Sequence, residues 1–370
     1  MAKKGVSRRD FLKSSAMGGV GAVLAYGLSP TWVVAAKADK TLRVAEILVG
    51  TPEDKGWNFE QFRGLQYIKE QLGDKVETFS VENVAEVDAE RVMRDLASQG
   101  YDLILSTSFG FMDATVAAAA AFPETKFVHN SGYKTAKNLS TVFAKMQEVR
   151  YLTGLVAGKM TKTNIIGCAA SFPLPLVILE LNAFALGVQA VNPGAVVKVV
   201  WTQTWFDPPK EREAAEALVT AGADVLCKYQ DSPTVEQVAE EHGIYSIGFH
   251  SDTSFVGKSV LTSARWHWGP VYERIAESVR DGTFASESYW GGMKDGVVEL
   301  GPYSPLVPKD VQDLVGKWQQ KIVAGWNPMT GPLSDQAGKL RVKDGVSMTD
   351  QDMQAIDWFV KGVEATLPKK

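Results

Sequence analysis

The sequence predicts an α/β protein built from two doubly wound parallel-sheet lobes. From residue 42 onward, apolar strand-like runs alternate with amphipathic helices, and the same alternation restarts near residue 145. Alternation of this kind places helices on both faces of a mostly parallel sheet. Removal of an N-terminal leader leaves roughly 330 residues, a length that exceeds one comfortable core and suits two domains.

The first lobe is expected to alternate four strands with three helices. The strands are predicted over residues 42–49, 76–80, 102–107 and 126–130. The helices are predicted over residues 58–72, 88–100 and 113–122. The first helix carries Phe62, Leu65 and Ile68 at the three-to-four spacing of one helical face, so this face is expected to pack on the sheet.

The alternation that restarts near residue 145 repeats the architecture without repeating the sequence. Strands are predicted over residues 164–169, 195–202, 224–229, 245–249 and 259–263. Helices are predicted over residues 149–160, 177–192, 209–222, 232–242 and 269–282. The run Asn192-Pro193-Gly194 is a strong helix stop. From about Ser286 the chain is irregular and rich in Gly, Pro and Trp, so it is expected to cross between the lobes or wrap their surfaces.

These elements predict a division of the chain into four parts. Residues 1–38 form a signal peptide, and residues 39–144 with about 260–290 form the first lobe. Residues 145–259 with about 291–345 form the second lobe, and residues 346–370 form a C-terminal surface segment. Because each lobe is made of discontinuous stretches, several chain crossings are expected to join the two.

The first forty residues indicate export. Ser7-Arg8-Arg9-Asp10-Phe11-Leu12-Lys13 is a full twin-arginine motif, and an apolar run over residues 16–36 follows it. The small-residue pattern Ala36-Lys37-Ala38 predicts cleavage and a mature start near Asp39. A membrane anchor is the alternative, but a Gly-rich run interrupted by Ser29-Pro30 makes a poor spanning helix. The mature protein is therefore expected in the periplasm.

Composition and motifs argue against several classes of function. The net charge is −4, and no basic stretch interleaved with aromatic residues indicates a nucleic-acid partner. The chain has no dinucleotide-binding glycine motif, no P-loop and no nucleophile elbow. Its four histidines are dispersed, so no metal, cofactor or catalytic residue is predicted. A periplasmic enzyme remains the alternative if the carboxylates Asp54, Asp113, Asp231 and Asp252 converge.

The two cysteines, Cys168 and Cys227, both lie in apolar strand-like runs. An oxidising periplasm permits a disulfide between them. Buried cysteines are also common as inert thiols, and the two spacings suit two core strands. The second interpretation is favoured, and the first stays open.

Ligands of doubly wound proteins bind outside the carboxyl ends of the strands. The predicted strand ends are dense in aromatic residues, whose faces stack on flat rings, and each carries a polar neighbour able to hydrogen-bond a heterocycle edge. Trp57 and Trp205 follow early strands of the two lobes and are expected to sandwich one ring as the lobes close. The candidate ligand-binding residues are Trp57, Asn58, Phe109, Asp113, Asn130, Trp205, Tyr229, Asp231, His250 and Trp266.

The strand ends resemble those of the basic membrane protein family of periplasmic and lipoprotein receptors. The resemblance spans about residues 41–300 and rests on the order and spacing of short motifs. These are Asp54-Lys55-Gly56-Trp57-Asn58 with Gly64, Gly110-Phe111-Met112-Asp113-Ala114, Glu148 with Tyr151 and Gly154, Trp205-Phe206-Asp207-Pro208 with Ala214-Ala215, Gly248 with Ser251-Asp252, and Leu261-Thr262-Ser263.

The resemblance implies the type I periplasmic-binding fold and service to an ABC permease of the inner membrane, for purine nucleosides or related bases. It also implies that Trp57 and Trp205 stack on opposite faces of the purine, with Asn58 and Asp113 at its edge. A monomer is expected. Within the same fold, the alternatives are another solute such as a sugar or an amide, and a sensory receptor in place of a transport receptor.

Two departures from the family pattern bear on the ligand. Nucleoside binders usually carry Gly-Val-Asp-Ser-Asp where this chain has Gly248-Phe249-His250-Ser251-Asp252. They also carry a Lys near the position where this chain has Arg265 and Trp266. Without the Asp and Lys, the ribose hydroxyls of a nucleoside would be buried unpaired. The predicted ligand is therefore a free, adenine-like nucleobase, with a purine nucleoside as the alternative.

Overall fold

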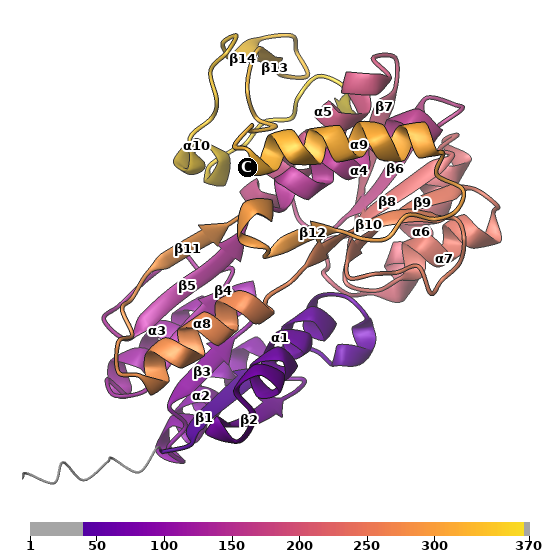
Figure 1. The fold of residues 1–370 in the computed structure, drawn as a ribbon. Helices are drawn as coiled ribbons and strands as arrows, with labels where there is room; N and C mark the ends of the chain where they lie inside the picture. Colours follow the sequence, from indigo (N-terminus) through magenta and orange to yellow (C-terminus); the bar gives the residue numbers. More distant parts are fainter. Residues whose placement is uncertain (1–39, 366–370) are drawn as a thin grey trace, which may run out of the picture. The chain divides into compact units, whose positions relative to one another are not determined.

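The computed structural model describes residues 40–365. The predicted signal peptide, its cleavage site and the last five residues lie outside this range. Two parallel β-sheets, each flanked by helices, organise the described residues (Figure 1). This architecture confirms the predicted α/β class.

The first sheet has six parallel strands in the order β11-β5-β4-β3-β1-β2. Its strands are β1 (Leu42–Ile47), β2 (Val76–Val81), β3 (Leu103–Ser106), β4 (Lys126–Asn130), β5 (Leu139–Ala144) and β11 (Ser288–Gly291). The helices of this lobe are α1 (Trp57–Leu72), α2 (Ala89–Ser98), α3 (Met112–Ala121) and α8 (Gly269–Arg280).

Alternate residues of β1 point to opposite faces of the first sheet and enter two different cores. Leu42 and Val44 share a core with Leu65 and Ile68 of α1, as the spacing of the first helix predicts. Ala45 shares the other core with residues of α2 and α3. Burial on both faces explains why the parallel strands are continuous apolar runs.

The second sheet has seven strands in the order β12-β10-β9-β8-β6-β7-β15. They are β6 (Ile165–Ala170), β7 (Val196–Trp201), β8 (Val225–Tyr229), β9 (Tyr245–His250), β10 (Val260–Trp266), β12 (Val298–Leu300) and β15 (Val363–Glu364). All pairings are parallel except that of β12 with β10. The helices are α4 (Met146–Met160), α5 (Pro175–Val191), α6 (Pro208–Thr220), α7 (Thr234–Glu241) and α9 (Lys309–Val323).

Helices α4 and α5 pack closely because glycines lie where they touch. A Cβ at Gly154 of α4 would lie 2.1 Å from the Phe184 carbonyl oxygen, and one at Gly187 of α5 would lie 2.1 Å from that of Tyr151. Only glycine permits so close an approach of two backbones. Gly154 belongs to one of the motifs that carry the family resemblance, and here its role is packing.

Within residues 40–365 the chain passes between the two sheets three times. The passages follow β5, β10 and β11, whose ends lie next to one another in Figure 1. Several chain crossings between the lobes were expected from the discontinuous stretches. The sheets differ from the predicted boundaries at two places. Strand β10 pairs with β9, and β15 of the predicted C-terminal surface segment pairs with β7, so both strands belong to the second sheet. The return to the first lobe comes after Trp266.

The region beyond Ser286 is more regular than its composition predicted. It contains β11, β12 and α9, then β13 (Leu333–Ser334), β14 (Leu340–Val342), α10 (Asp350–Gln354) and β15. Strand β5 was also missed, because only a short loop separates it from β4. Short 3-10 turns occupy Pro52–Asp54, Gly73–Lys75, Glu86–Asp88, Phe109–Phe111 and Met293–Asp295.

Cys168 and Cys227 face one another on the neighbouring strands β6 and β8. Both are buried free thiols in the structure. The prediction of two core strands at these positions is therefore confirmed.

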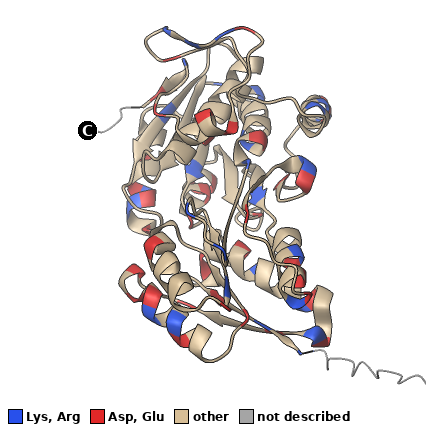
Figure 2. Ribbon diagram, turned by 90° about the vertical axis from the view of Figure 1, so that its left-hand side faces the viewer, with Lys and Arg blue, Asp and Glu red and all other residues tan. Residues whose placement is uncertain are grey.

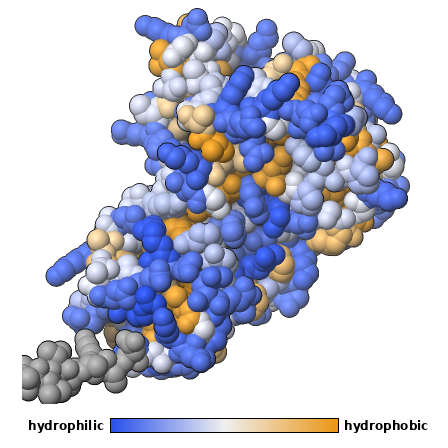
Figure 3. All heavy atoms as spheres, in the orientation of Figure 1, coloured by the Kyte–Doolittle hydropathy of each residue, from blue (hydrophilic) through white to orange (hydrophobic). Residues whose placement is uncertain are grey.

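Surface features complete the description. Acidic and basic residues are interspersed over the described chain in Figure 2. On the face shown in Figure 3, hydrophobic residues form separate patches among hydrophilic ones. None of the helices within residues 40–365 is both long enough and apolar enough to cross a membrane.

Candidate ligand-binding site

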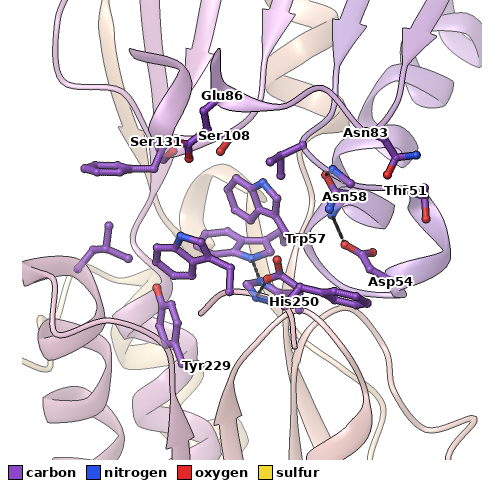
Figure 4. A pocket seen from close by; sticks show the side chains of 18 of the residues that line it. Thr51, Asp54, Trp57, Asn58, Asn83, Glu86, Ser108, Ser131, Tyr229 and His250 are labelled. Carbon is purple, nitrogen blue, oxygen red and sulfur yellow. Dashed lines mark hydrogen bonds and ion pairs between the residues drawn. The ribbon is translucent and has the colours of Figure 1, made fainter. Parts of the chain in front are cut away.

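A cavity of about 350 Å³ opens where the carboxyl ends of the two sheets face each other. Its volume lies in the range of roughly 300–1,000 Å³ that is typical of small-molecule sites. Figure 4 shows its lining side chains converging from both lobes. They are Val49, Gly50, Thr51, Asp54, Trp57, Asn58, Asn83, Glu86, Ser108, Phe109, Ser131, Phe143, Leu176, Trp205, Phe206, Tyr229, Asp231, His250 and Trp266.

Strand ends position most of this lining. Ser108 and Ser131 follow β3 and β4 of the first sheet, whereas Tyr229 and His250 end β8 and β9 of the second. The carboxyl ends of parallel strands lie at one edge of each sheet, so these side chains meet although they are far apart in sequence.

Trp57 lies at the centre of an aromatic wall. Its ring meets those of His250, Trp266 and Trp268 edge-on, with centroid distances of 5.9, 5.8 and 6.0 Å. Trp266 and Trp268 stack on each other at 4.9 Å. The Trp57 indole N–H donates to the Thr107 carbonyl oxygen at 2.7 Å. Because its one polar group is bonded inside the protein, Trp57 offers the cavity only its apolar ring.

Trp205 belongs to a second group of rings, on the other lobe. Its centroid lies 5.2 Å from Phe172 and 6.4 Å from Tyr229. The Tyr229 hydroxyl donates to the buried Glu180 carboxylate at 2.9 Å, which fixes that ring as well. Among residues 40–365, the rings of Trp57 and Trp205 each contact other aromatic rings but do not contact each other. A sandwich around a third ring requires such a separation.

Asp54 organises the first-lobe side of the cavity. One carboxylate oxygen accepts the backbone N–H groups of Gly56 and Phe59, and the other accepts the backbone N–H and the side-chain amide of Asn58. The Asn58 side-chain oxygen in turn accepts the Gly50 N–H at 3.2 Å. Negative charge at this position also suits the N-terminus of α1. Asn58 is thus bonded within the protein at both ends of its amide.

Asp231 and His250 organise the second-lobe side. The His250 Nε2 atom lies 3.1 Å from an Asp231 carboxylate oxygen. Burial raises the pKa of Asp231 to about 7, although the Lys228 ammonium acts against this. Burial also holds the pKa of His250 well below its usual value, with Lys228 acting in the same direction, so the imidazole is neutral at pH 7.

Three residues that line the cavity adopt left-handed backbone conformations. The φ angles are 56° at Asn83, 68° at Ser131 and 71° at His250. Non-glycine residues rarely adopt such angles, and those that do cluster at functional sites. The strained residues mark the cavity independently of its shape.

Eight of the ten predicted residues line the cavity: Trp57, Asn58, Phe109, Trp205, Tyr229, Asp231, His250 and Trp266. Asp113 does not, because it lies on an outer face of α3, where its side chain is 85% exposed and pairs with Lys134. Asn130 does not either, because it is buried beneath the cavity and donates to the Tyr272 hydroxyl at 2.8 Å. Its partner Tyr272 lies on α8, 142 positions further along the chain.

Sequence reasoning missed several lining residues. Asp54, Ser108, Ser131 and Phe206 lie within five residues of the carboxyl ends of predicted strands, and the strand-end rule alone would have included them. Phe143 and Leu176 had no such signal. Phe143 lies on β5, which was not predicted, and Leu176 lies in the first turn of α5.

The described residues contain no group of three or more His, Cys, Asp or Glu side chains arranged to hold a metal ion. Of the four carboxylates that an enzyme would have to bring together, Asp54 and Asp231 face the same cavity. Asp113 is on the surface, and one Asp252 carboxylate oxygen accepts the Ser254 N–H in its own loop.

Comparison with known proteins agrees with this architecture. A family model described as ABC transporter substrate-binding protein, PnrA-like, matches residues 41–327. The model of twin-arginine translocation signal sequences matches residues 5–25. The chain is therefore exported, and it is a periplasmic protein.

Three known proteins illustrate the similarity. A purine-binding protein of Brucella abortus is 43% identical over 338 residues, which are 90% of this chain and 96% of the relative. A Haloferax volcanii protein named as a candidate ABC transporter glucose-binding protein is 36% identical over 89% of this chain and 82% of its own length. The structure of an ABC transporter solute-binding protein from Conexibacter woesei superposes with a TM-score of 0.65, at 24% identity, over 77% of this chain and 97% of its own.

Proposed function

This chain belongs to the PnrA-like family of ABC transporter substrate-binding proteins, and we propose that the solute it binds is an adenine-like purine base. Members of this family bind solutes and do not catalyse a reaction. The single observation that carries the proposal is the cavity between Trp57 and Trp205, which is lined by seven Phe, Trp and Tyr rings. The Trp57 indole N–H and the Tyr229 hydroxyl are bonded inside the protein. A flat heterocycle suits such a wall because its faces stack on the rings.

The charge of the cavity supports an uncharged ligand. Its lining includes the acidic side chains of Asp54, Glu86 and Asp231, and no Lys or Arg is among the lining residues that the structure describes. A phosphate or carboxylate group would find no cationic partner there and would meet like charge. Nucleotides are therefore poor candidates, whereas nucleobases and nucleosides are not excluded by charge.

The preference for a base over a nucleoside rests on His250 and Trp266. These residues stand where nucleoside binders of the family carry groups for the ribose hydroxyls. The Trp266 N–H donates to His250 Nδ1 at 2.8 Å, and neither side chain supplies the carboxylate or the ammonium of those binders. The name of the Brucella abortus relative, a purine-binding protein, supports the same class of ligand.

Lobe closure is the proposed mechanism of capture. Loop and helix residues of the first lobe already touch the second, since the Ser251 hydroxyl donates to the Lys55 carbonyl oxygen and Gly56 lies against Asp231. A ligand that contacts both lobes favours the closed form over the open form. We propose that the monomer in this closed form is what the permease recognises.

Calorimetric titration of the mature protein with adenine, adenosine and glucose tests the proposal. We expect adenine to bind tightest, and Trp57→Ala and Trp205→Ala each to weaken binding by about 1–3 kcal/mol, the scale of base–aromatic stacking. Phe255→Ala removes an exposed ring outside the cavity and should leave affinity unchanged. Tighter binding of adenosine would shift the assignment to a nucleoside. Glucose binding without purine binding would overturn it in favour of a sugar, as the name of the Haloferax volcanii relative suggests.

A further inference from the structure

Asp231 and His250 differ from the other buried polar groups of the cavity, because part of their hydrogen-bonding capacity is not used inside the protein. Asp54, Asn58 and Tyr229 are all engaged in the bonds given above. Within residues 40–365, His250 Nε2 has no hydrogen-bond partner, and the side-chain contact of the Asp231 carboxylate is its approach to this nitrogen. His250 Nε2 lies 3.1 Å from an Asp231 carboxylate oxygen, but the two groups are not oriented to form a hydrogen bond.

The proton of His250 can be placed from its neighbour. An indole N–H only donates, and Trp266 donates to His250 Nδ1 at 2.8 Å. Nδ1 is therefore the acceptor, so the neutral ring carries its hydrogen on Nε2. His250 consequently presents an N–H donor directly beside the acceptor oxygens of Asp231.

Burial makes these unused groups costly without a ligand. The side chains of His250 and Asp231 are only 5% and 8% exposed. A buried polar group without a partner costs free energy that a complementary ligand recovers. The left-handed backbone at His250, with φ 71°, holds the ring in this position and is the kind of strain found at binding sites.

We propose that Asp231 and His250 together recognise one polar edge of the ligand, an N–H group with an unprotonated ring nitrogen next to it. The Asp231 carboxylate accepts from the ligand N–H, and His250 Nε2–H donates to the neighbouring nitrogen. This inference rests on the proposed function and deepens it by naming the chemical pattern that the site selects. Adenine carries this pattern at its amino group beside N1 or N7, and at N9–H beside N3.

Methylated adenines show which edge is recognised. In 9-methyladenine only the amino edge keeps an N–H, and in N6,N6-dimethyladenine only the N9–H edge does. The compound methylated at both places has no N–H at all. We expect one of the two singly blocked compounds to bind about tenfold or more weakly than adenine, and the doubly blocked compound to bind no better than that one.

Two substitutions at His250 separate its donor from its structural role. His250→Asn places its amide oxygen near the position of Nδ1, so it still accepts from Trp266, and asparagine tolerates a left-handed backbone. It lacks the Nε2–H donor, so we expect adenine affinity to fall about tenfold or more. His250→Gln carries a donor near the position of Nε2 and should bind more tightly than His250→Asn.

Asp231→Ala completes the test. The methylated compound that binds poorly to the wild type should bind to this variant with the same affinity. That compound lacks the N–H group that Asp231 would accept from, so removal of the carboxylate takes away no contact. The inference would be wrong if the wild type and all three variants showed the same relative affinities for the four compounds. If the wild type binds no purine at all, the proposed function fails first. If adenine binds and depends on Trp57 and Trp205 but not on Asp231 and His250, only this inference fails.

Discussion

Gly56 of the first lobe lies directly against the backbone carbonyl of Asp231 in the second lobe. A Cβ added to Gly56 would lie 2.0 Å from that carbonyl oxygen and 2.8 Å from its carbon. Backbone atoms on both sides leave no flexible side chain to give way. The Asp231 N–H is also bonded to the Trp205 carbonyl oxygen at 3.0 Å, which holds this loop in place. The absence of a side chain at Gly56 is therefore what permits the lobes to approach this closely.

Gly56→Ala should weaken ligand binding about tenfold or more by preventing full closure, since a tenfold change in affinity corresponds to about 1.4 kcal/mol. The φ of Gly56 is −126°, so alanine adds no left-handed strain there. Calorimetric titration with adenine measures it. Gly316→Ala is the control, because a Cβ there meets nothing within 4 Å. Equal affinity of Gly56→Ala and the control would show that closure does not need this contact.

Buried carboxyl groups should make the protein less stable as pH rises from about 6.5 to 8. Burial raises the pKa of Asp231, Glu60 and Glu211 to about 7 and that of Glu46 and Glu180 to about 8. In this range the folded protein binds more protons than the unfolded chain, so the free energy of unfolding falls with rising pH. Thermal unfolding scans should show a lower Tm at pH 8 than at pH 6.5.

Because of the buried histidines, this prediction applies only above about pH 6.5. Burial lowers the pKa of His129 to about 4 and that of His250 well below 6.5. Below about pH 6.5 the unfolded chain protonates these residues and offsets the carboxyl groups. Glu180→Gln, which still accepts from Tyr229, should make the slope above pH 6.5 shallower, whereas Glu124→Gln on the surface should not. A Tm that rises toward pH 8 would contradict the assignment.

The two cysteines should be present as unreactive thiols in the native protein. Cys168 and Cys227 are fully buried, so thiol reagents do not reach either sulfur in the folded protein. Thiol titration should detect none in the native protein and two after unfolding without reductant. Detection of none after unfolding would instead reveal a disulfide between strands β6 and β8.

Asn182 should anchor the C-terminal segment that lies beyond the matched family region. Its side-chain amide donates to the Trp358 carbonyl oxygen at 2.9 Å, and its oxygen accepts the Val360 N–H at 2.9 Å. Asn182→Ala leaves both backbone groups without this partner, so we expect a loss of about 1–3 kcal/mol in urea unfolding. Gln320→Ala on the exposed face of α9 is the control. Equal stability of the two variants would mean that the segment is held by other contacts.

The regular core of the fold was predictable because its signals are local. Strands such as Leu103–Ser106 are short apolar runs, and helices such as α1 have an apolar face at helical spacing. Helix α9 was missed, since the Gly, Pro and Trp residues in and around it indicate a loop. Strand β10 was assigned to the wrong lobe. Its lobe is decided by its pairing with β9, and a local sequence pattern does not reveal which strands pair.

By itself the sequence determined the export signal, the α/β class, the family and most of the side chains at the strand ends. These depend on residue type and on distance along the chain. The tertiary structure decided which of those side chains share one cavity, and it excluded Asp113 and Asn130, whose neighbours Lys134 and Tyr272 come from other segments. It also separated Asp54 and Asn58, which bond to each other, from His250, whose Nε2 atom has no hydrogen-bond partner among the described residues. A hydrogen bond depends on the position of both partners, and only folding brings those partners together.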